Sequence, residues 1–289
     1  MPETNAHGLD HLVIGVADLD AAGAFYADLG FRVGARNRHP WGTENRIVQF
    51  PGAFLELITV GDATLIPPHA PRSFSFGAFV RDALGRGEGM SMLVLESRDS
   101  TGDAEGFRGA GIGDFEPFFF ERQARRPDGS EVRVAFSLAF ADNRAAPDCG
   151  FFVCQQHEPQ NFWNPAFQQH ENGTSALSAV FLVTPEPAAQ ADFLRAFSGA
   201  ASFATPEAGL RLPLPRGRLE VLTPQAAAAM LGDPRPEQAR FAGFAVTVRE
   251  LDIVGSRLAE RGIAHHRDGA RVVVPASAAY GCAIVFEMG

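Results

Sequence analysis

Three short apolar segments of the sequence each carry one glutamate near the centre, and these carboxylates are the first candidates for chemistry. Residues 53–60 read AFLELITV, residues 217–224 read GRLEVLTP, and the chain ends in AIVFEMG. Side chains alternate between the two faces of a strand, and both faces of the first segment are apolar, so we expect Glu56 to be buried or half-buried. A buried carboxylate needs a partner, which is a metal ion, an arginine or a backbone N–H group.

Composition and charge restrict the classes of function. The chain has 289 residues, of which 46% are hydrophobic, and this length suggests about two domains. A formal net charge of −9 and the lack of a basic stripe argue against nucleic acid and anionic membranes as partners. The three cysteines form no paired metal-binding spacing and fit a reducing compartment. Without a secretory signal in residues 1–8 or an apolar run of about 20 residues, we expect a cytoplasmic protein.

The glutamate-bearing strands close a pattern of elements that starts near residue 9. A strand from Leu9 leads to a helix that has Asp18 as its N-cap and ends at a left-handed Gly30. A second strand is predicted over 31–36, and a hairpin of two further strands turns at 51–52. The first unit is therefore a βαβββ module of about 50 residues that ends with the Glu56 strand.

The same order of elements returns three times along the chain. It begins again near residues 89, 175 and 242, and offsets of 81 and 232 place the glycine that ends the helix on Gly111 and Gly262. One βαβββ unit leaves a sheet face exposed, and pairing two units closes an incomplete barrel with a cavity inside. We therefore predict an α+β fold in which four βαβββ modules pair into two incomplete barrels.

The two barrels are expected to form two domains. The segment 157–175 is polar, rich in Asn and Gln, and without periodicity, so it marks the boundary. The predicted parts of the chain are an N-terminal barrel over 1–160 with modules at about 8–60 and 89–157, a linker over 161–174, and a C-terminal barrel over 175–289 with modules at about 175–224 and 240–289.

Several stretches of the first half resemble the vicinal oxygen chelate superfamily, and within it the glyoxalase-like domain proteins of bacteria. They read LDHLVIGVADLDAAGAFYADLGF, RHPWGTENRIVQF and FLELI, with a weaker likeness in FFVCQQHEP at 151–159. The resemblance implies a cup that often holds a divalent metal and binds a small oxygenated metabolite. It implies either a metal-dependent lyase, isomerase or dioxygenase, or a non-catalytic protein that binds a small molecule or antibiotic, as bleomycin-resistance proteins do.

The resemblance also implies which residues hold the metal. The superfamily usually draws its ligands from a histidine early in the first strand of a module and a glutamate in the middle of the fourth. His11 and Glu56 occupy these places, and imidazole with carboxylate suits Zn, Fe, Mn or Ni. Glu56 is also the candidate catalytic base. The alternative is that His11 is a hydrogen-bonded core residue and that Glu56 is paired with an arginine.

The other modules lack a histidine at the place of His11. Met92 takes that place in the second module, where we expect it to contact substrate and not metal. Ser178 and Gly243 take it in the third and fourth modules. The second barrel is therefore predicted to be structural or to act as a binding wall.

The fourth strand of the second module has two possible positions. If residues 151–156 form it, Gln155 points into the cup as a substrate contact, or His157 does so as a third metal ligand. If it follows the turn at 127–129 instead, Arg133 lies near the glutamate position. The first alternative keeps the strand order of the first module, and we prefer it.

The loop RNRHPWGTEN at 36–45 is predicted to lie at the mouth of the cup. Its Pro and Gly constrain the loop, and it combines an aromatic plate with polar groups, which suits a small-molecule pocket. The predicted substrate contacts of this loop are His39, Trp41, Thr43 and Asn45, and Trp163 in the linker is expected to close the pocket. The alternative is a surface turn with a packed tryptophan. A homodimer is left open.

Overall fold

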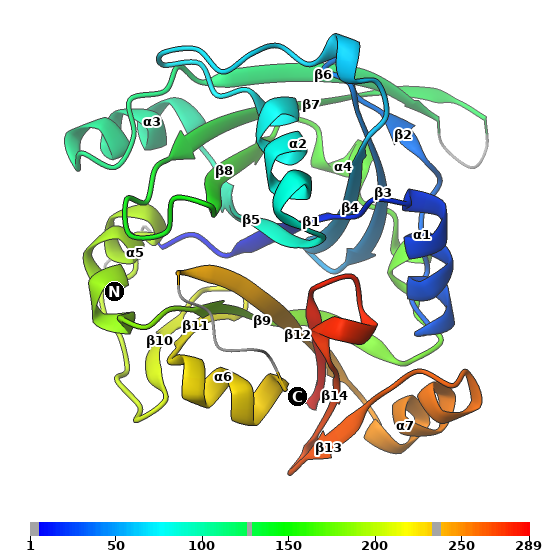
Figure 1. Ribbon diagram of the computed structural model, residues 1–289. Coiled ribbons are helices and arrows are strands. Elements are labelled where there is room, and N and C mark those ends of the chain that lie inside the picture. Colours follow the sequence, from blue (N-terminus) through cyan, green and yellow to red (C-terminus); the bar gives the residue numbers. More distant parts are fainter. Residues whose placement is uncertain (1–5, 126–128, 233–237) are drawn as a thin grey trace.

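The computed structural model describes residues 6–125, 129–232 and 238–289, and its N-terminal half contains two modules joined by a helix (Figure 1). The elements of this half are β1 (Leu9–Gly15), α1 (Leu19–Asp28), β2 (Asn37–Arg38), β3 (Thr43–Phe50), β4 (Ala53–Val60), η1 (Ala63–Leu65), α2 (Phe76–Arg86), β5 (Gly89–Ser97), α3 (Ser100–Gly109), β6 (Phe118–Arg125), β7 (Glu131–Ala141), β8 (Gly150–Gln156), α4 (Pro159–Phe162) and η2 (Pro165–Gln168).

The C-terminal half has a similar order of elements. Its elements are β9 (Thr174–Val183), η3 (Pro187–Gln190), α5 (Ala191–Ser198), β10 (Gly209–Pro213), β11 (Arg218–Leu222), α6 (Pro224–Leu231), β12 (Arg240–Val248), α7 (Leu251–Glu260), β13 (His266–Asp268), β14 (Arg271–Val274), η4 (Ala276–Ala278) and β15 (Ala283–Met288).

The strands form two mixed sheets, one in each half. The first has the order β2-β3-β4-β1-β5-β8-β7-β6 and the second the order β10-β11-β9-β12-β15-β14-β13. In each half the first strands of the two modules pair antiparallel, β1 with β5 and β9 with β12. The predicted fold class, an α+β fold of paired modules in two incomplete barrels, is confirmed.

Local signals of the repeat are also confirmed. The carboxylate of Asp18 accepts hydrogen bonds from the backbone N–H groups of the first turn of α1. Gly30, Gly111 and Gly262 follow the module helices with φ of 92°, 69° and 64°, a left-handed conformation that glycine adopts without a steric penalty.

Two details of the predicted modules are wrong. Residues 31–36 form no strand, because the single bond from Gly34 N to Ile47 O does not continue into a regular strand pairing. The second strand, β2, is limited to Asn37–Arg38. The third module has only three strands, and an isolated bridge between Ala204 and Arg211 stands where the extra strand was expected. The preferred fourth strand of the second module is confirmed as β8. Pro127 and Asp128 of the alternative turn lie outside the described residues.

The two sheets pack back to back. Leu12 and Leu55 of the first sheet share one continuous buried cluster with Val180 and Phe244 of the second, and Figure 1 shows β1 and β5 lying over β9 and β12. The predicted domain boundaries at 160 and 175 stay predictions, but the core does not stop at them. None of the helices in the described ranges is long and apolar enough to span a membrane.

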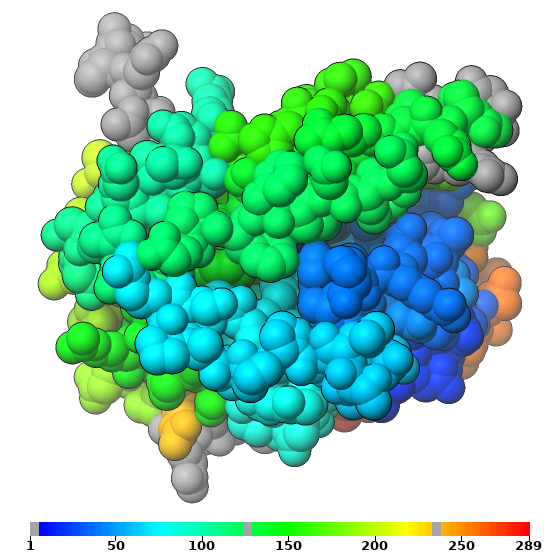
Figure 2. All heavy atoms as spheres, turned by 90° about the horizontal axis from the view of Figure 1, so that it is seen from above, coloured from blue at the N-terminus to red at the C-terminus, as the bar shows by residue number. Residues whose placement is uncertain are grey.

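Each sheet has a second face that is covered by a helix following the fourth strand of a module. In the N-terminal half Phe76 and Val80 of α2 pack on this face, which is rich in aromatic side chains. In the C-terminal half Ala227 and Leu231 of α6 pack there on a surface rich in alanine. Seen from above, the molecule shows mainly its N-terminal half, with β6 and β7 beside the segment that precedes α2 (Figure 2).

The core that crosses both halves predicts a single cooperative unfolding transition. Phe151 is fully buried and packs against Phe193, Phe197 and Phe241 of the other half. Phe151→Ala should lower the free energy of unfolding by about 3–5 kcal/mol, measured by denaturant titration. Phe119→Ala, at a ring that is 52% exposed, should change it by less than about 0.5 kcal/mol. Two separate transitions in the wild type would contradict this.

Candidate functional site

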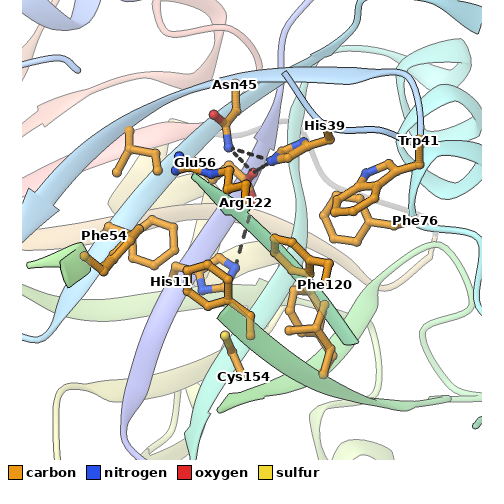
Figure 3. Close-up of a pocket in the computed structure, with 15 residues that line it drawn as sticks. His11, His39, Trp41, Asn45, Phe54, Glu56, Phe76, Phe120, Arg122 and Cys154 are labelled. Carbon is orange, nitrogen blue, oxygen red and sulfur yellow. Dashed lines mark hydrogen bonds and ion pairs between the residues drawn. The ribbon is translucent and has the colours of Figure 1, made fainter. Parts of the chain in front are cut away.

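A small cavity of about 50 Å³ lies inside the N-terminal cup, between β4, α2 and β6. Aromatic rings form most of its wall, among them Phe54, Phe76, Phe120, Phe136, Phe152 and Phe162. Its polar lining residues are His11, His39, Asn45, Glu56 and Arg122, and Figure 3 shows them converging on one region. The cavity has room for an ion or a few water molecules, so a larger ligand must extend out of it.

Glu56 is turned into this cavity by the alternation of β4. Phe54 and Glu56 line the cavity, while Leu55 and Leu57 pack into the core between the two sheets. The Glu56 side chain is buried, with the residue 6% exposed. Its carboxylate is therefore placed among apolar rings, where a negative charge is costly unless it is matched by positive charge or hydrogen bonds.

Three polar side chains approach the Glu56 carboxylate, and Arg122 adds a positive charge without an ion pair. Asn45 Nδ2 donates a hydrogen bond of 2.5 Å to Oε1. His11 Nε2 lies 4.0 Å from Oε2, and His39 Nε2 lies 3.9 Å from Oε1. Among the described residues no lysine or arginine forms an ion pair with Glu56, so its charge is only partly compensated.

His11 is oriented by its neighbour in the sequence. The pairing of β1 with β5 is irregular between Leu9 and His11, so Asp10 is the extra residue of a bulge. The bulge lets the buried Asp10 carboxylate reach His11 Nδ1 at 2.5 Å, and Gln156 Nε2 donates to its other oxygen at 3.1 Å. A carboxylate only accepts, so Nδ1 carries the proton and Nε2 is directed at Glu56.

The gap between His11 and Glu56 fits a divalent cation. At 4.0 Å the two atoms are too far apart for a hydrogen bond, yet a metal with bonds of about 2.1 Å could contact both. A lone pair on Nε2 facing a carboxylate oxygen is satisfied by a proton or by a cation. The Asp10–His11 pair is also the arrangement that commonly supports a metal-binding imidazole.

A second group of possible ligands fits a metal less well. Asp10, His11 and Cys154 are the described His, Cys, Asp or Glu residues whose ligand atoms lie within 4.8 Å of one another. However, the Asp10 oxygen is already bonded to the imidazole. Burial also raises the pKa of the Cys154 thiol well above its usual value, so it stays protonated and is a poor ligand.

The loop at 36–45 folds over the cavity and forms its polar corner. His39 Nδ1 is bonded to Thr43 Oγ1 at 2.8 Å, and Asn45 Nδ2 lies 3.3 Å from His39 Nε2. Because Asn45 donates, Nε2 is the acceptor and the proton sits on Nδ1. Burial lowers the pKa of His39, which keeps the ring neutral near pH 7. Trp41 stacks on His39 with 4.7 Å between ring centroids.

Five of the predicted residues do not line this inner cavity. Thr43 is fully buried behind the loop, with its Oγ1 2.8 Å from His39 Nδ1. Met92 is fully buried in the packed core of the cup. Gln155 faces the start of α3, where its Oε1 accepts from Ser100 N at 3.1 Å.

The remaining two lie near the linker and the rim. His157 is exposed, with its Nε2 2.8 Å from Ser137 Oγ, so we do not retain it as a ligand. Trp163 packs against Phe54 and lines an adjoining outer cavity.

Sequence reasoning missed two charged residues of the site. Arg122 lies on β6 in the segment FFFERQAR, where Phe118, Phe120 and Arg122 alternate with outward residues. That alternation was a usable signal, because two aromatic rings on one face indicate the direction of the cup. Asp10 had no such signal, since a regular strand would turn it away from His11.

The C-terminal half shows a different environment for its glutamates. Glu220 lies at the place of Glu56 in its module and is paired with Arg218 at 2.6 Å and Arg211 at 3.4 Å. Glu287 is bound by Arg218 and by Ser178. These carboxylates have arginine partners in a cup filled by α6, so the strand glutamates of this half are structural.

Comparison with known proteins identifies the family. The family model described as a glyoxalase-like domain matches residues 9–197, which is more than half of the chain. The chain belongs to the glyoxalase-like domain family. The predicted resemblance to the vicinal oxygen chelate superfamily is thereby confirmed. A comparison with curated proteins gave no match.

Solved structures share the fold of this glyoxalase-like protein at low sequence identity. A hypothetical protein from Staphylococcus aureus is 11% identical, with a TM-score of 0.67 over 98% of this chain and 99% of that one. A variant of 4-hydroxymandelate synthase from Streptomyces coelicolor is 12% identical, with a TM-score of 0.55 over 98% and 93%. BphC, a halotolerant catechol dioxygenase, is 7% identical, with a TM-score of 0.57 over 98% and 87%. At these identities the likeness shows the fold alone.

The contrast between Glu56 and Glu220 predicts opposite effects of the same substitution. Glu56→Gln removes a buried charge that Arg122 influences but does not bind in an ion pair, and it should raise the free energy of unfolding by about 1 kcal/mol. Glu220→Gln leaves Arg211 without its carboxylate and Arg218 with Glu287 alone, and it should lower the free energy of unfolding by about 1–3 kcal/mol. Denaturant titration with a chelator present measures both, because bound metal would add stability of its own. A shift of the same sign in both variants would contradict the assignment.

Burial of His39 predicts a pH effect on stability. Its folded pKa is below the ordinary value of 6.5, so the unfolded chain takes up the proton first as the pH falls. The stability linked to neutral His39 is present above 6.5 and is lost as the pH falls below it. His39→Gln should flatten this part of the profile, measured by denaturation between about pH 5 and pH 8, whereas the exposed His69→Gln should not. An unchanged slope in His39→Gln would refute the effect.

Proposed function

We propose that the N-terminal cup is the functional site and binds a small oxygenated metabolite beside His11 and Glu56, with a divalent metal held between them. The observation that carries this proposal is the partly compensated Glu56 carboxylate, which lies 4.0 Å from His11 Nε2 inside an aromatic cavity. A natural protein retains a buried charge of this kind at a stability cost, and such sites are commonly functional.

The residues of the cup have distinct roles in this proposal. His11 and Glu56 hold the metal, and Asp10 fixes the imidazole so that Nε2 is available. Asn45 keeps the Glu56 carboxylate in place through its 2.5 Å hydrogen bond. When bound, the metal supplies Lewis acidity toward the oxygens of the metabolite, which lowers the barrier to lyase, isomerase or dioxygenase chemistry.

In this proposal, side chains of the protein and not the metal accept the proton from the bound metabolite. Neutral His39 lines the cavity with its Nε2 3.3 Å from Asn45 Nδ2 and 3.9 Å from Glu56 Oε1, and it is the candidate proton acceptor when a ligand replaces the contact with Asn45. Glu56 is the alternative base when no metal occupies its oxygens. The aromatic wall excludes water from both groups, which strengthens their electrostatic interactions with a ligand.

A second candidate function is binding without catalysis. The second module contributes Phe136, Leu138, Phe152 and Cys154 to the cavity, and none of these is a suitable ligand for a hard divalent ion. This lining favours sequestration of an apolar small molecule, with His11 and Glu56 as polar groups of the cavity wall. The two functions differ in whether metal is bound.

The metal assignment predicts stoichiometric metal in the purified protein. Elemental analysis after anaerobic purification should find about one divalent ion per chain, lost in His11→Ala and in Glu56→Gln. Asp10→Asn should weaken metal affinity by roughly 10–100-fold, because it removes the carboxylate that orients His11.

The control is the equivalent glutamate of the other half. Glu220→Gln should retain the metal, since Glu220 is paired with arginines. If the wild type holds no stoichiometric metal after anaerobic purification and reloading, the metalloenzyme assignment fails and the binding function takes its place.

A further inference from the structure

Arg122 projects from the edge strand β6 into the cup, where the Glu56 carboxylate acts on its charge without forming an ion pair with it. It is half-buried, it lines the cavity that contains Glu56, and among the described residues its side chain forms no hydrogen bond or ion pair. Burial lowers its pKa and the charge of Glu56 partly offsets this, but a guanidinium remains a cation at neutral pH. A half-buried guanidinium whose N–H groups make no hydrogen bond to a described residue can accept an anion.

The space beside Arg122 is large enough for a metabolite. An outer cavity of about 410 Å³ adjoins the inner one and shares Ile47, Arg122 and Phe162 with it. Volumes of this size are typical of small-molecule sites. Arg122 therefore lies where an outer cavity that can hold a ligand body meets the inner cavity with His11 and Glu56.

The lining of the outer cavity favours a negatively charged ligand. Its lining in the described part of the chain contains arginines and side-chain amides but no carboxylate, although the chain as a whole has a net charge of −9. The other arginine, Arg32, donates to Ala166 O and lies over the ring of Phe167. Arg122 is thus the cation of this cavity that is available to a ligand.

We propose that Arg122 binds the carboxylate of the ligand, so that the substrates are small carboxylic acids with an apolar body. This rests on the proposed function of the cup and names its substrate class. A planar guanidinium matches a carboxylate through two parallel hydrogen bonds. The rings of Phe120, Phe136 and Phe162 beside it suit an aromatic or branched hydrocarbon body.

The proposal places the ligand relative to the chemistry. The carboxylate of the ligand binds Arg122 where the two cavities meet. The ligand atoms next to this carboxylate lie toward His11 and Glu56. Repulsion from Glu56 prevents the carboxylate from entering further unless a cation lies between them. Arg122 thereby acts as a specificity residue that admits acids and fixes their orientation.

Matched pairs of acids and amides test this proposal. Benzoate with benzamide, phenylacetate with phenylacetamide, and isobutyrate with isobutyramide differ in charge but hardly in shape. Both tryptophans of the chain, Trp41 and Trp163, line the two cavities, so quenching of their fluorescence reports binding there. In metal-free wild type at least one acid should bind about tenfold or more tightly than its amide, as a charge-assisted bidentate pair implies.

Variants of Arg122 test whether this residue causes the preference for acids over amides. Arg122→Gln should bind the acid and the amide about equally, and Arg122→Lys should keep only part of the preference because its ammonium lacks the planar fork. Arg133→Gln is the matched control, since Arg133 lies on the neighbouring strand and pairs with the exposed Glu121 and with Glu158. It should leave the preference unchanged.

The outcomes separate this proposal from the metal assignment. The thermal midpoint of Arg122→Gln should be equal to or above that of the wild type, because an unpaired charge is removed; a large fall would make Arg122 a structural residue and overturn the proposal. It is also overturned if no acid is preferred, or if the preference survives in Arg122→Gln. An Arg122-dependent preference in a protein that never takes up metal would uphold it while refuting the metal assignment.

Discussion

A carboxylate buried among aromatic rings must be matched by positive charge or by hydrogen bonds, and the arrangement of the N-terminal cup follows from that requirement at Glu56. Asn45 satisfies one oxygen directly, and His11 approaches the other oxygen without reaching hydrogen-bond distance. The charge is therefore held in place by the fold but not neutralised by it. In the proposed function, a cation between Glu56 and the imidazole would complete the compensation of this charge.

The C-terminal half shows what the same strand position becomes when the requirement is met internally. There Arg211 and Arg218 neutralise Glu220, and α6 fills the concave face with small side chains. In the N-terminal half α2 takes the corresponding place but leaves a cavity against the loop at 36–45. One architecture thus supports a packed half and an open half, and the difference lies in which side chains fill the cup.

Back-to-back packing of the sheets connects the two halves mechanically. The continuous core between them, with Phe151 against three rings of the other half, rigidifies β1, β4 and β8, which form the floor of the cup. A well-packed support of this kind holds the catalytic or binding groups within narrow limits. The C-terminal half therefore supports the site through the strands it stabilises, and none of its described residues lines the inner cavity.

Much of the fold could be predicted from the sequence because its signals are local and periodic. Alternation along AFLELITV predicted a buried Glu56, and the recurring glycines after each helix indicated the repeated modules; both depend only on the backbone geometry of strands and helix ends. The pairing of His11 with Glu56 followed from the family resemblance, and the structure brings these side chains within 4.0 Å.

Other features were decided by tertiary structure. Gln155 and His157 face away from the cavity because the register of β8 turns Phe152 and Cys154 inward. Asp10 reaches His11 only through a bulge, and Arg122 meets Glu56 only because the sheet curls until its edge strand closes the cup. The sequence by itself determined the modules and the buried carboxylate, since these depend on neighbours along the chain. The tertiary structure alone decided which charges surround that carboxylate, since these come from strands that are distant in sequence and are brought together by sheet curvature and register.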